Sequence, residues 1–115
     1  MALDPLQTLD VIEAMENYLS RERPPEEIRK KLDLGYKIEG QSILILEIRP
    51  QWNDPNIIHE YPVAKATFVK SKNKWKVFWM RSNLKWHSYS PKPTVKSVRD
   101  FTKLVEEDEY HCFWG

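Results

Sequence analysis

Residues 63–89 read VAKATFVKSKNKWKVFWMRSNLKWHSY, and this stretch decides the fold. It contains three runs rich in β-branched and aromatic residues, separated by two short turns that contain Asn. The runs are residues 63–70, 75–81 and 84–89, and the turns are Lys72-Asn73 and Ser82-Asn83. Such runs favour strands, and Asn tolerates the positive φ of tight turns. The pattern therefore predicts a three-stranded antiparallel meander.

Two-residue turns would set the register of this meander. They predict that Ala66 lies opposite Trp79 and that Phe78 lies opposite His87. Because side chains alternate along a strand, the meander then has two unlike faces. The face expected to form the core carries Ala64, Ala66, Phe68, Val77, Trp79 and Trp86. The face expected to look outward carries Lys65, Thr67, Lys76, Phe78, Met80, Lys85, His87 and Tyr89.

Charge is distributed unevenly along the 115 residues, although the formal net charge is only +1. Residues 63–96 contain nine Lys or Arg and no Asp or Glu. Residues 1–62 contain seven basic and twelve acidic residues, and residues 97–115 contain two and five. A long acid-free stretch of this kind is typical of a surface that meets an anionic partner.

The segment before the meander predicts a hairpin and then a long loop. Strands are expected over 36–39 and 42–49, because Gly40-Gln41 suits a two-residue turn with Gly first. Residues 50–62 are expected to be the longest irregular stretch. Loops of this length in compact domains are often functional.

Helices are expected at both ends of the chain. Asp4-Pro5 is a good start for the first, with Asp as N-cap and Pro at the first helical position. Its apolar stripe is predicted to be Leu6, Leu9, Ile12, Met15 and Leu19. Residues 25–34 predict a short second helix that Gly35 ends in the left-handed conformation.

A third helix is expected after an N-cap at Thr94 or Ser97. Its predicted apolar stripe is Val98, Phe101, Leu104 and Val105. Residues 110–115 are expected to form a final strand or a packed tail. The whole pattern predicts one α+β domain over 1–115. It combines an antiparallel sheet of about five strands with N-terminal helices and a C-terminal helix packed on one face.

Cysteine content and hydropathy suggest a compartment. Cys112 is the one cysteine, so no disulfide can form within the chain. The longest apolar run, 43–46, is far too short to span a bilayer, and no signal peptide is evident. We therefore expect a protein of the reducing cytoplasm with no membrane partner.

Several strings resemble an uncharacterised bacterial family, a domain of unknown function (family 3024). They are ILEIRP at 45–50, PVAKA at 62–66, WKVFW at 75–79, LKWHSY at 84–89 and YHCFWG at 110–115. The resemblance covers nearly the whole chain, which implies a complete protein. It implies a bacterial, cytoplasmic origin and no particular activity.

The leading functional hypothesis is a small binding or accessory module, more plausibly not an enzyme. Basic side chains contact phosphates and aromatic rings stack on bases, so the outward face suits nucleic acid or an acidic protein surface. Lysines at the tip of the first turn would assist. The candidate binding residues are Lys65, Lys76, Phe78, Lys85, His87 and Tyr89, with Lys70, Lys72 and Lys74.

Two alternatives remain open at this stage. One is a metal-dependent nuclease, in which Asp33 and Glu47 would hold Mg²⁺ and Arg49 would take the place usually filled by Lys. Separately, Trp52, Asp54, His59 and Glu60 share the long loop, where they would line a pocket beside the sheet; in the competing interpretation Trp52 plugs the core under the loop. The other alternative is a homodimeric adaptor joined through an exposed sheet edge.

Metal and cofactor sites are not expected. The spacing of His59, His87, His111 and Cys112 fits no common zinc pattern. Cys112 is better interpreted as a small buried apolar residue than as a nucleophile.

Overall fold

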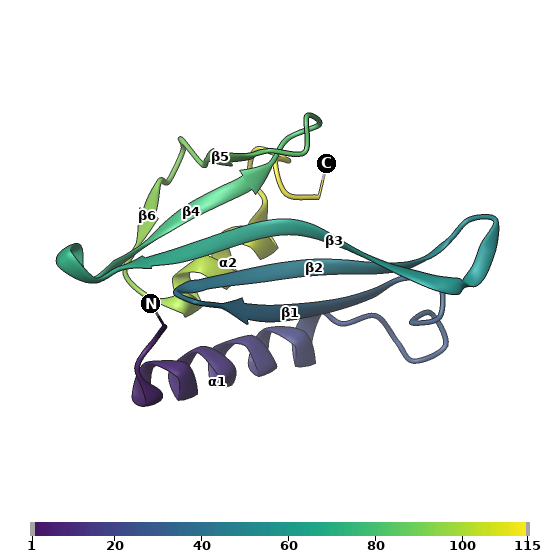
Figure 1. The fold of residues 1–115 in the computed structure, drawn as a ribbon, viewed down its shortest axis with the longest axis horizontal. Helices are drawn as coiled ribbons and strands as arrows, with labels where there is room; N and C mark the ends of the chain where they lie inside the picture. The colour runs from purple at the N-terminus through teal and green to yellow at the C-terminus, as the bar shows by residue number, and fades with distance from the viewer. Residues whose placement is uncertain (1, 115) are drawn as a thin grey trace.

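The computed structural model describes residues 2–114. Figure 1 shows a helix, a set of strands and a second helix in chain order. The elements are α1 (Pro5–Glu22), β1 (Asp33–Glu39), β2 (Ser42–Gln51), β3 (Asp54–Val69), a 3₁₀ turn (Lys70–Lys72), β4 (Lys74–Met80), β5 (Trp86–Ser88), β6 (Thr94–Val95) and α2 (Val98–Glu107). Neither helix has the length and apolar character needed to cross a membrane, within the residues described.

The strands form one antiparallel sheet in the order β1-β2-β3-β4-β5, and β6 also pairs with β4. The predicted α+β class is confirmed, including the helices at the two ends of the chain. The sheet has six strands rather than about five, because Thr94–Val95 pairs with Trp75 and Lys76. Thr94 is one of the two residues that the sequence suggests as the N-cap of the last helix, but it lies in β6 instead.

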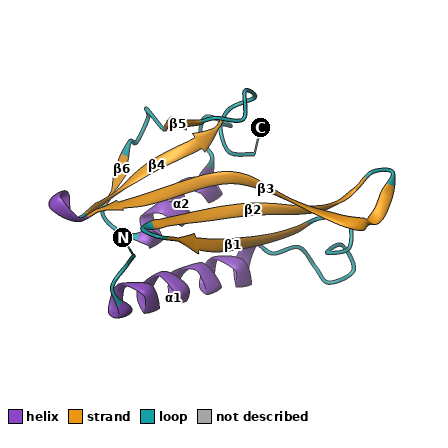
Figure 2. Ribbon diagram, viewed as in Figure 1, coloured by secondary structure: helices purple, strands orange, loops and turns teal. Residues whose placement is uncertain are grey.

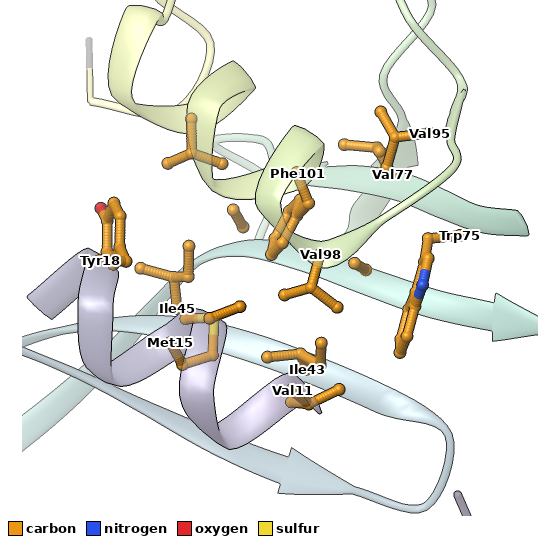
Figure 3. Packing of buried hydrophobic residues seen from close by; sticks show 14 of the residues in the cluster. Val11, Met15, Tyr18, Ile43, Ile45, Trp75, Val77, Val95, Val98 and Phe101 are labelled. Carbon is orange, nitrogen blue, oxygen red and sulfur yellow. The ribbon is translucent and has the colours of Figure 1, made fainter. Parts of the chain in front are cut away.

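Both helices lie on one face of the sheet, and the core fills the space between the helices and the sheet (Figure 3). Alternate residues of β2 and β3 point into it, so Ile43, Ile45, Ala64 and Ala66 are all completely buried. From α2, Phe101 enters the same cluster. Small alanines opposite large apolar side chains allow the layers to interdigitate at the density of protein interiors.

The starts of both helices follow their sequence signals. Asp4 accepts a hydrogen bond from the backbone N–H of Gln7 at 2.8 Å, and Pro5 is the first helical residue. Ser97 accepts one from the N–H of Asp100 at 3.1 Å, so Ser97 rather than Thr94 is the N-cap of α2. These caps satisfy donors that the first helical turn cannot pair internally.

The predicted apolar stripe of α1 is wrong in its first half. Leu6 and Leu9 are 76% and 62% exposed, and Ile12 is exposed as well. The buried stripe is instead Val11, Ala14, Met15 and Tyr18. Both stripes have helical spacing, so periodicity alone could not decide which one faces the sheet.

The predicted second helix does not form. Its residues make a series of turns, in which the N–H of Ile28 bonds to the carbonyl of Pro25 at 2.8 Å. Gly35 is not a helix cap but lies inside β1, opposite Leu46. A Cβ at this position would lie 3.0 Å from Cδ1 of Ile48, so a larger residue would require the Ile48 side chain to move.

The predicted irregular loop over 50–62 is also wrong. Most of it continues β2 and β3 as a long hairpin, which extends well beyond the ends of both helices (Figure 2). We call residues 50–62 the projecting hairpin. Trp52 lies in its turn and is 93% exposed, so it does not plug the core. The molecule is consequently elongated, at 46 × 30 × 26 Å.

Candidate functional site

The sheet face away from α1 and α2 carries the most distinctive side-chain arrangement. Cross-strand partners share a face of a sheet, and three such pairs define this region. Lys65 is opposite Phe78, Thr67 is opposite Lys76, and Met80 is opposite Trp86. We call these six residues the open-face patch.

Lys65 lies at the centre of the open-face patch. Its Nζ is 4.8 Å from the centroid of the Phe78 ring and 4.9 Å from that of the Trp86 ring. Both distances are within the range of cation–π attraction. Burial lowers the pKa of Lys65, and the charge of Glu39 partly opposes that shift. All three side chains of this arrangement are half-buried, so each still has surface for a partner.

Positive charge continues from the patch along the β3–β4 hairpin. Lys74 shares the face of Lys76, since alternate residues of β4 point the same way. Lys70 and Lys72 lie in the 3₁₀ turn at the hairpin tip, and all four of these lysines are exposed. The described structure thus joins the aromatic part of the patch to a lysine-rich turn.

Hydrogen bonds and apolar contacts support the floor of the patch. The hydroxyls of Ser42 and Thr67 are 2.8 Å apart across β2 and β3. Leu44 is opposite Lys65 and only 7% exposed, although it lies on the face away from the helices. The aliphatic stems of neighbouring lysines can cover such a residue while their charges stay in water.

Two predicted members of the binding face lie elsewhere. His87 pairs with Trp79 and is therefore on the helix side of the sheet, half-buried. Tyr89 is 1% exposed, with its ring 4.9 Å from that of Phe113 in the core. Lys85 is exposed in the connection between β4 and β5. Trp86, which was predicted to enter the core, takes the outward position instead.

The cause of this exchange is the connection between β4 and β5. A two-residue turn at Ser82-Asn83 was predicted, but Leu84 adopts a positive φ of 61°. The Asn83 side chain accepts a hydrogen bond from the N–H of Lys85 at 3.1 Å. The longer turn moves the register of β5 by one residue, and a one-residue shift reverses both faces of a strand. The sequence does contain one indication of this turn, because an Asn side chain can accept a hydrogen bond from the backbone N–H two residues further on.

The register between β3 and β4 also differs, but without consequence for the faces. Ala66 is opposite Val77 rather than Trp79. Asn73 has φ 50°, as its turn position suggested, and follows the 3₁₀ turn Lys70–Lys72. The shift is two residues, so every side chain of β3 and β4 keeps its predicted face.

The two carboxylates of the alternative nuclease site are not brought together. Glu47 pairs with Leu34 on the helix side, whereas Asp33 pairs with Ile48 on the opposite face. Glu47 forms an ion pair with Arg49 at 3.2 Å. In the part of the chain that is described, no group of three His, Cys, Asp or Glu side chains could hold a metal ion.

The remaining alternative-site residues lie along the projecting hairpin. Trp52 is at its turn, and Nε2 of His59 is 3.0 Å from Oε1 of Gln51. Glu60 forms an ion pair with Lys37 at 3.1 Å. These contacts give each polar side chain a local partner rather than a shared pocket.

Cys112 has an environment unlike that of a nucleophile. Burial, and secondarily the charge of Asp108, raises the pKa of its thiol. Its Sγ lies 3.8 Å from the carbonyl oxygen of Tyr110. A reactive cysteine needs a lowered pKa, because the thiolate is the nucleophile.

Asp33 has a structural partner, and a pH prediction follows. Its carboxylate accepts two hydrogen bonds from Arg23, at 2.8 and 2.7 Å, which lower its pKa; burial opposes the shift. A carboxyl with a lowered folded pKa stabilises the fold above about pH 4 and loses that contribution as pH falls through the folded value. We expect Asp33→Asn to lower the urea midpoint at pH 7. The difference from the parent protein should fade at pH 3 and below.

A control for this pH series is Asp54→Asn in the projecting hairpin, which removes an acid that forms no ion pair among the described residues. Its difference from the parent should be small at both pH values. A pH-independent effect of Asp33→Asn would contradict the role given to the Arg23 pair.

The fold and the open-face patch together define a class of protein: a helix-backed antiparallel sheet with a basic and aromatic surface. The chain belongs to the family described as "Domain of unknown function (DUF3024)", whose model matches residues 3–115. The family resemblance found from the sequence is thus confirmed. No curated protein matches the chain, and no solved structure does.

Proposed function

We propose that the open-face patch binds single-stranded nucleic acid. The observation that carries the proposal is the position of Lys65 Nζ, within 4.9 Å of the ring centroids of both Phe78 and Trp86 on the face away from the helices. Rings can stack on any base, and each stacked base contributes about 1–3 kcal/mol. The lysine provides a charge for the phosphate that joins two stacked bases.

The lysines of β4 extend this site into a track. Lys76 belongs to the open-face patch, and Lys74 follows it on the same face of β4. Lys70 and Lys72 then extend the row of positive charges into the turn. A strand of nucleic acid lying along β4 would meet one positive charge after another. The acid-free stretch 63–96 serves this track, because a nearby carboxylate would repel phosphate.

Salt dependence provides the test of this proposal. We expect a fluorescein-labelled dT20 oligonucleotide to bind, with log affinity falling linearly as log salt rises. For single strands the slope is about −0.7 per phosphate neutralised, so the five lysines of the patch and the track predict a slope of about −3.5. Lys76→Ala should make that slope shallower by about 0.7. Fluorescence anisotropy at four salt concentrations measures both quantities.

The matched control is Lys30→Ala, which removes an identical charge from an exposed turn after α1. Its slope should equal that of the parent protein. Absence of binding at low salt would overturn the proposal. Displacement of the oligonucleotide by poly-L-glutamate at equal charge would favour an acidic protein partner instead. Light scattering on the same samples tests the homodimer alternative through the mass of the free protein.

Such a function suits a protein of the bacterial cytoplasm, which is reducing and contains nucleic acid. It requires no catalysis, cofactor or metal. The open-face patch would act by holding a strand, as an accessory to some other activity.

A further inference from the structure

A cavity of about 330 Å³ lies on the helix side of the sheet, away from the open-face patch. It is open to solvent, and its lining comes from the C-terminal part of α1, the segment that follows it, β1, β2, the end of α2 and Trp114. Its walls combine apolar surface from Leu34 and Trp114 with the side chains of Tyr18, Glu22, Glu47 and Glu106. A pocket with an apolar body and a few converging polar groups is the usual form of a small-molecule site.

Three carboxylates reach this cavity from three different elements. Glu22 comes from α1, Glu47 from β2 and Glu106 from α2. Arg21 pairs with Oε1 of Glu106 at 2.6 Å, and Arg49 pairs with Oε2 of Glu47 at 3.2 Å. Neither arginine lines the cavity, so the other oxygen of each carboxylate remains for a ligand.

Glu22 has no ion pair within residues 2–114. The three carboxylates and the two arginines together carry a net charge of −1. Arg21 and Arg49 thus neutralise part of the negative charge that lines the cavity. The uncompensated charge is that of the most exposed of them, at the mouth of the cavity.

Tyr18 provides a second, independent observation. Its side chain is 99% buried, since only 1% is exposed, and it lines this cavity. Figure 3 shows its hydroxyl oxygen at the margin of the apolar cluster, pointing away from Met15 and Ile45. Burial raises the pKa of Tyr18, and the charges of Glu22 and Glu106 add to this, while Arg21 opposes it.

Trp114 forms a fixed wall opposite these acids. Its indole Nε1–H donates to the carbonyl of Val105 at 3.0 Å, and its backbone N–H donates to Oδ2 of Asp108, also at 3.0 Å. The indole ring is therefore held in place rather than free to rotate. An indole ring held in this way offers a large apolar surface to a ligand.

We propose that this cavity binds a small organic cation, an ammonium or guanidinium group carried on an apolar body. The carboxylates and the Tyr18 oxygen accept hydrogen bonds from the charged group, and the Trp114 ring contacts the body. Charge-assisted hydrogen bonds to carboxylates are the strong ones, and here they form in a partly desolvated site. The site lies on the other side of the sheet from the open-face patch and selects the opposite charge.

The test uses 2-phenylethylamine as the cationic probe and 2-phenylethanol as its neutral analogue. The signal of the Trp114 indole N–H, assigned with Trp114→Phe, is followed by NMR during titration at pH 7. We expect a saturable shift with the amine at millimolar concentration and at least tenfold weaker binding of the alcohol. Benzylguanidine in a third titration decides whether the planar head group binds more tightly than the ammonium.

Variants then assign the roles of the side chains. Glu22→Gln should weaken amine binding fivefold or more, and Tyr18→Phe should weaken it with little change in melting temperature. Glu27→Gln, at an exposed position outside the cavity, is the matched control and should bind as the parent does. Equal binding of amine and alcohol, no shift at 20 mM amine, or unchanged binding by Glu22→Gln would overturn the proposal. Failure here leaves oligonucleotide binding unaffected, because that assay depends on residues of the other face.

Discussion

Replacing both Phe78 and Trp86 by Leu is expected to weaken oligonucleotide binding by about 30-fold or more. Each ring that stacks on a base contributes about 1–3 kcal/mol, and 1.4 kcal/mol corresponds to a factor of ten in affinity. Leu keeps apolar volume over the sheet but has no π face for a base or for Lys65 Nζ, which lies 4.8 Å from the Phe78 ring centroid. Fluorescence anisotropy with dT20 at fixed low salt measures the change.

The salt slope separates stacking from charge in this experiment. The double variant keeps every lysine, so its slope should match that of the parent protein even though its affinity is lower. Tyr110→Leu is the control, since Tyr110 is an aromatic residue 59% exposed after the end of α2. Unchanged affinity of the double variant would show that the rings only pack against Lys65. Far-UV circular dichroism of each variant checks that the fold is retained.

Alternation along strands allowed much of this surface to be predicted. Lys65, Lys76 and Phe78 could be assigned to one face because β3 and β4 are regular and their turn changed the register by an even number of residues. Burial of Ala64 and Ala66 on the other face followed from the same rule. Local capping chemistry likewise located the starts of α1 and α2.

The β5 side of the site could not be predicted from alternation. A single residue with positive φ, Leu84, lengthens the turn and reverses the face of Trp86 and His87. Leu seldom adopts this conformation, because its Cβ approaches the backbone carbonyl. The hydrogen bond from the Lys85 N–H to the Asn83 side chain stabilises this conformation. Because several compact turns are compatible with such a sequence, the length of the turn could not be predicted.

The projecting hairpin was missed for a different reason. Residues 50–62 were predicted to be irregular, yet Pro55 and Pro62 both lie in β3. Before Ala64, β3 pairs with β2 but not with β4, because the first residue of β3 that pairs with β4 is Ala64, opposite Trp79. Proline is tolerated on such an edge, where its missing N–H faces no partner strand. Edge or centre is a tertiary property that a local pattern does not contain.

The sequence does not indicate the cavity on the helix side either. Glu22, Glu47 and Glu106 are far apart in the sequence, and nothing in their spacing suggests a common site. Only the packing of α1 and α2 on the same sheet face brings them together. The fold also supplies Glu106 with a basic neighbour, Arg21.

Asp108→Ala is expected to destabilise the protein by about 2–4 kcal/mol. Asp108 is 7% exposed, and its carboxylate accepts hydrogen bonds from the backbone N–H groups of Phe113 and Trp114, each at 3.0 Å. Leaving a buried donor without a partner costs about 1–3 kcal/mol. Asp108 also has φ 40°, where Ala is strained by about 1–2 kcal/mol and Asn is better tolerated. Urea denaturation of Asp108→Ala, Asp108→Asn and the exposed control Glu109→Ala should rank the first as least stable and the last as unchanged.

The effect should begin at the chain end rather than in the sheet. With its anchor removed, the tail that carries Phe113 and Trp114 can leave its place while β2, β3 and β4 stay paired. Amide hydrogen exchange of Phe113 and Trp114 should therefore accelerate more than that of Ala66. Because Trp114 is one wall of the cation cavity, Asp108→Ala should also weaken 2-phenylethylamine binding, whereas the salt slope for dT20 should be unchanged. Equal acceleration throughout the chain would mean that Asp108 acts on the whole core, and the tail would then not be a separate unit.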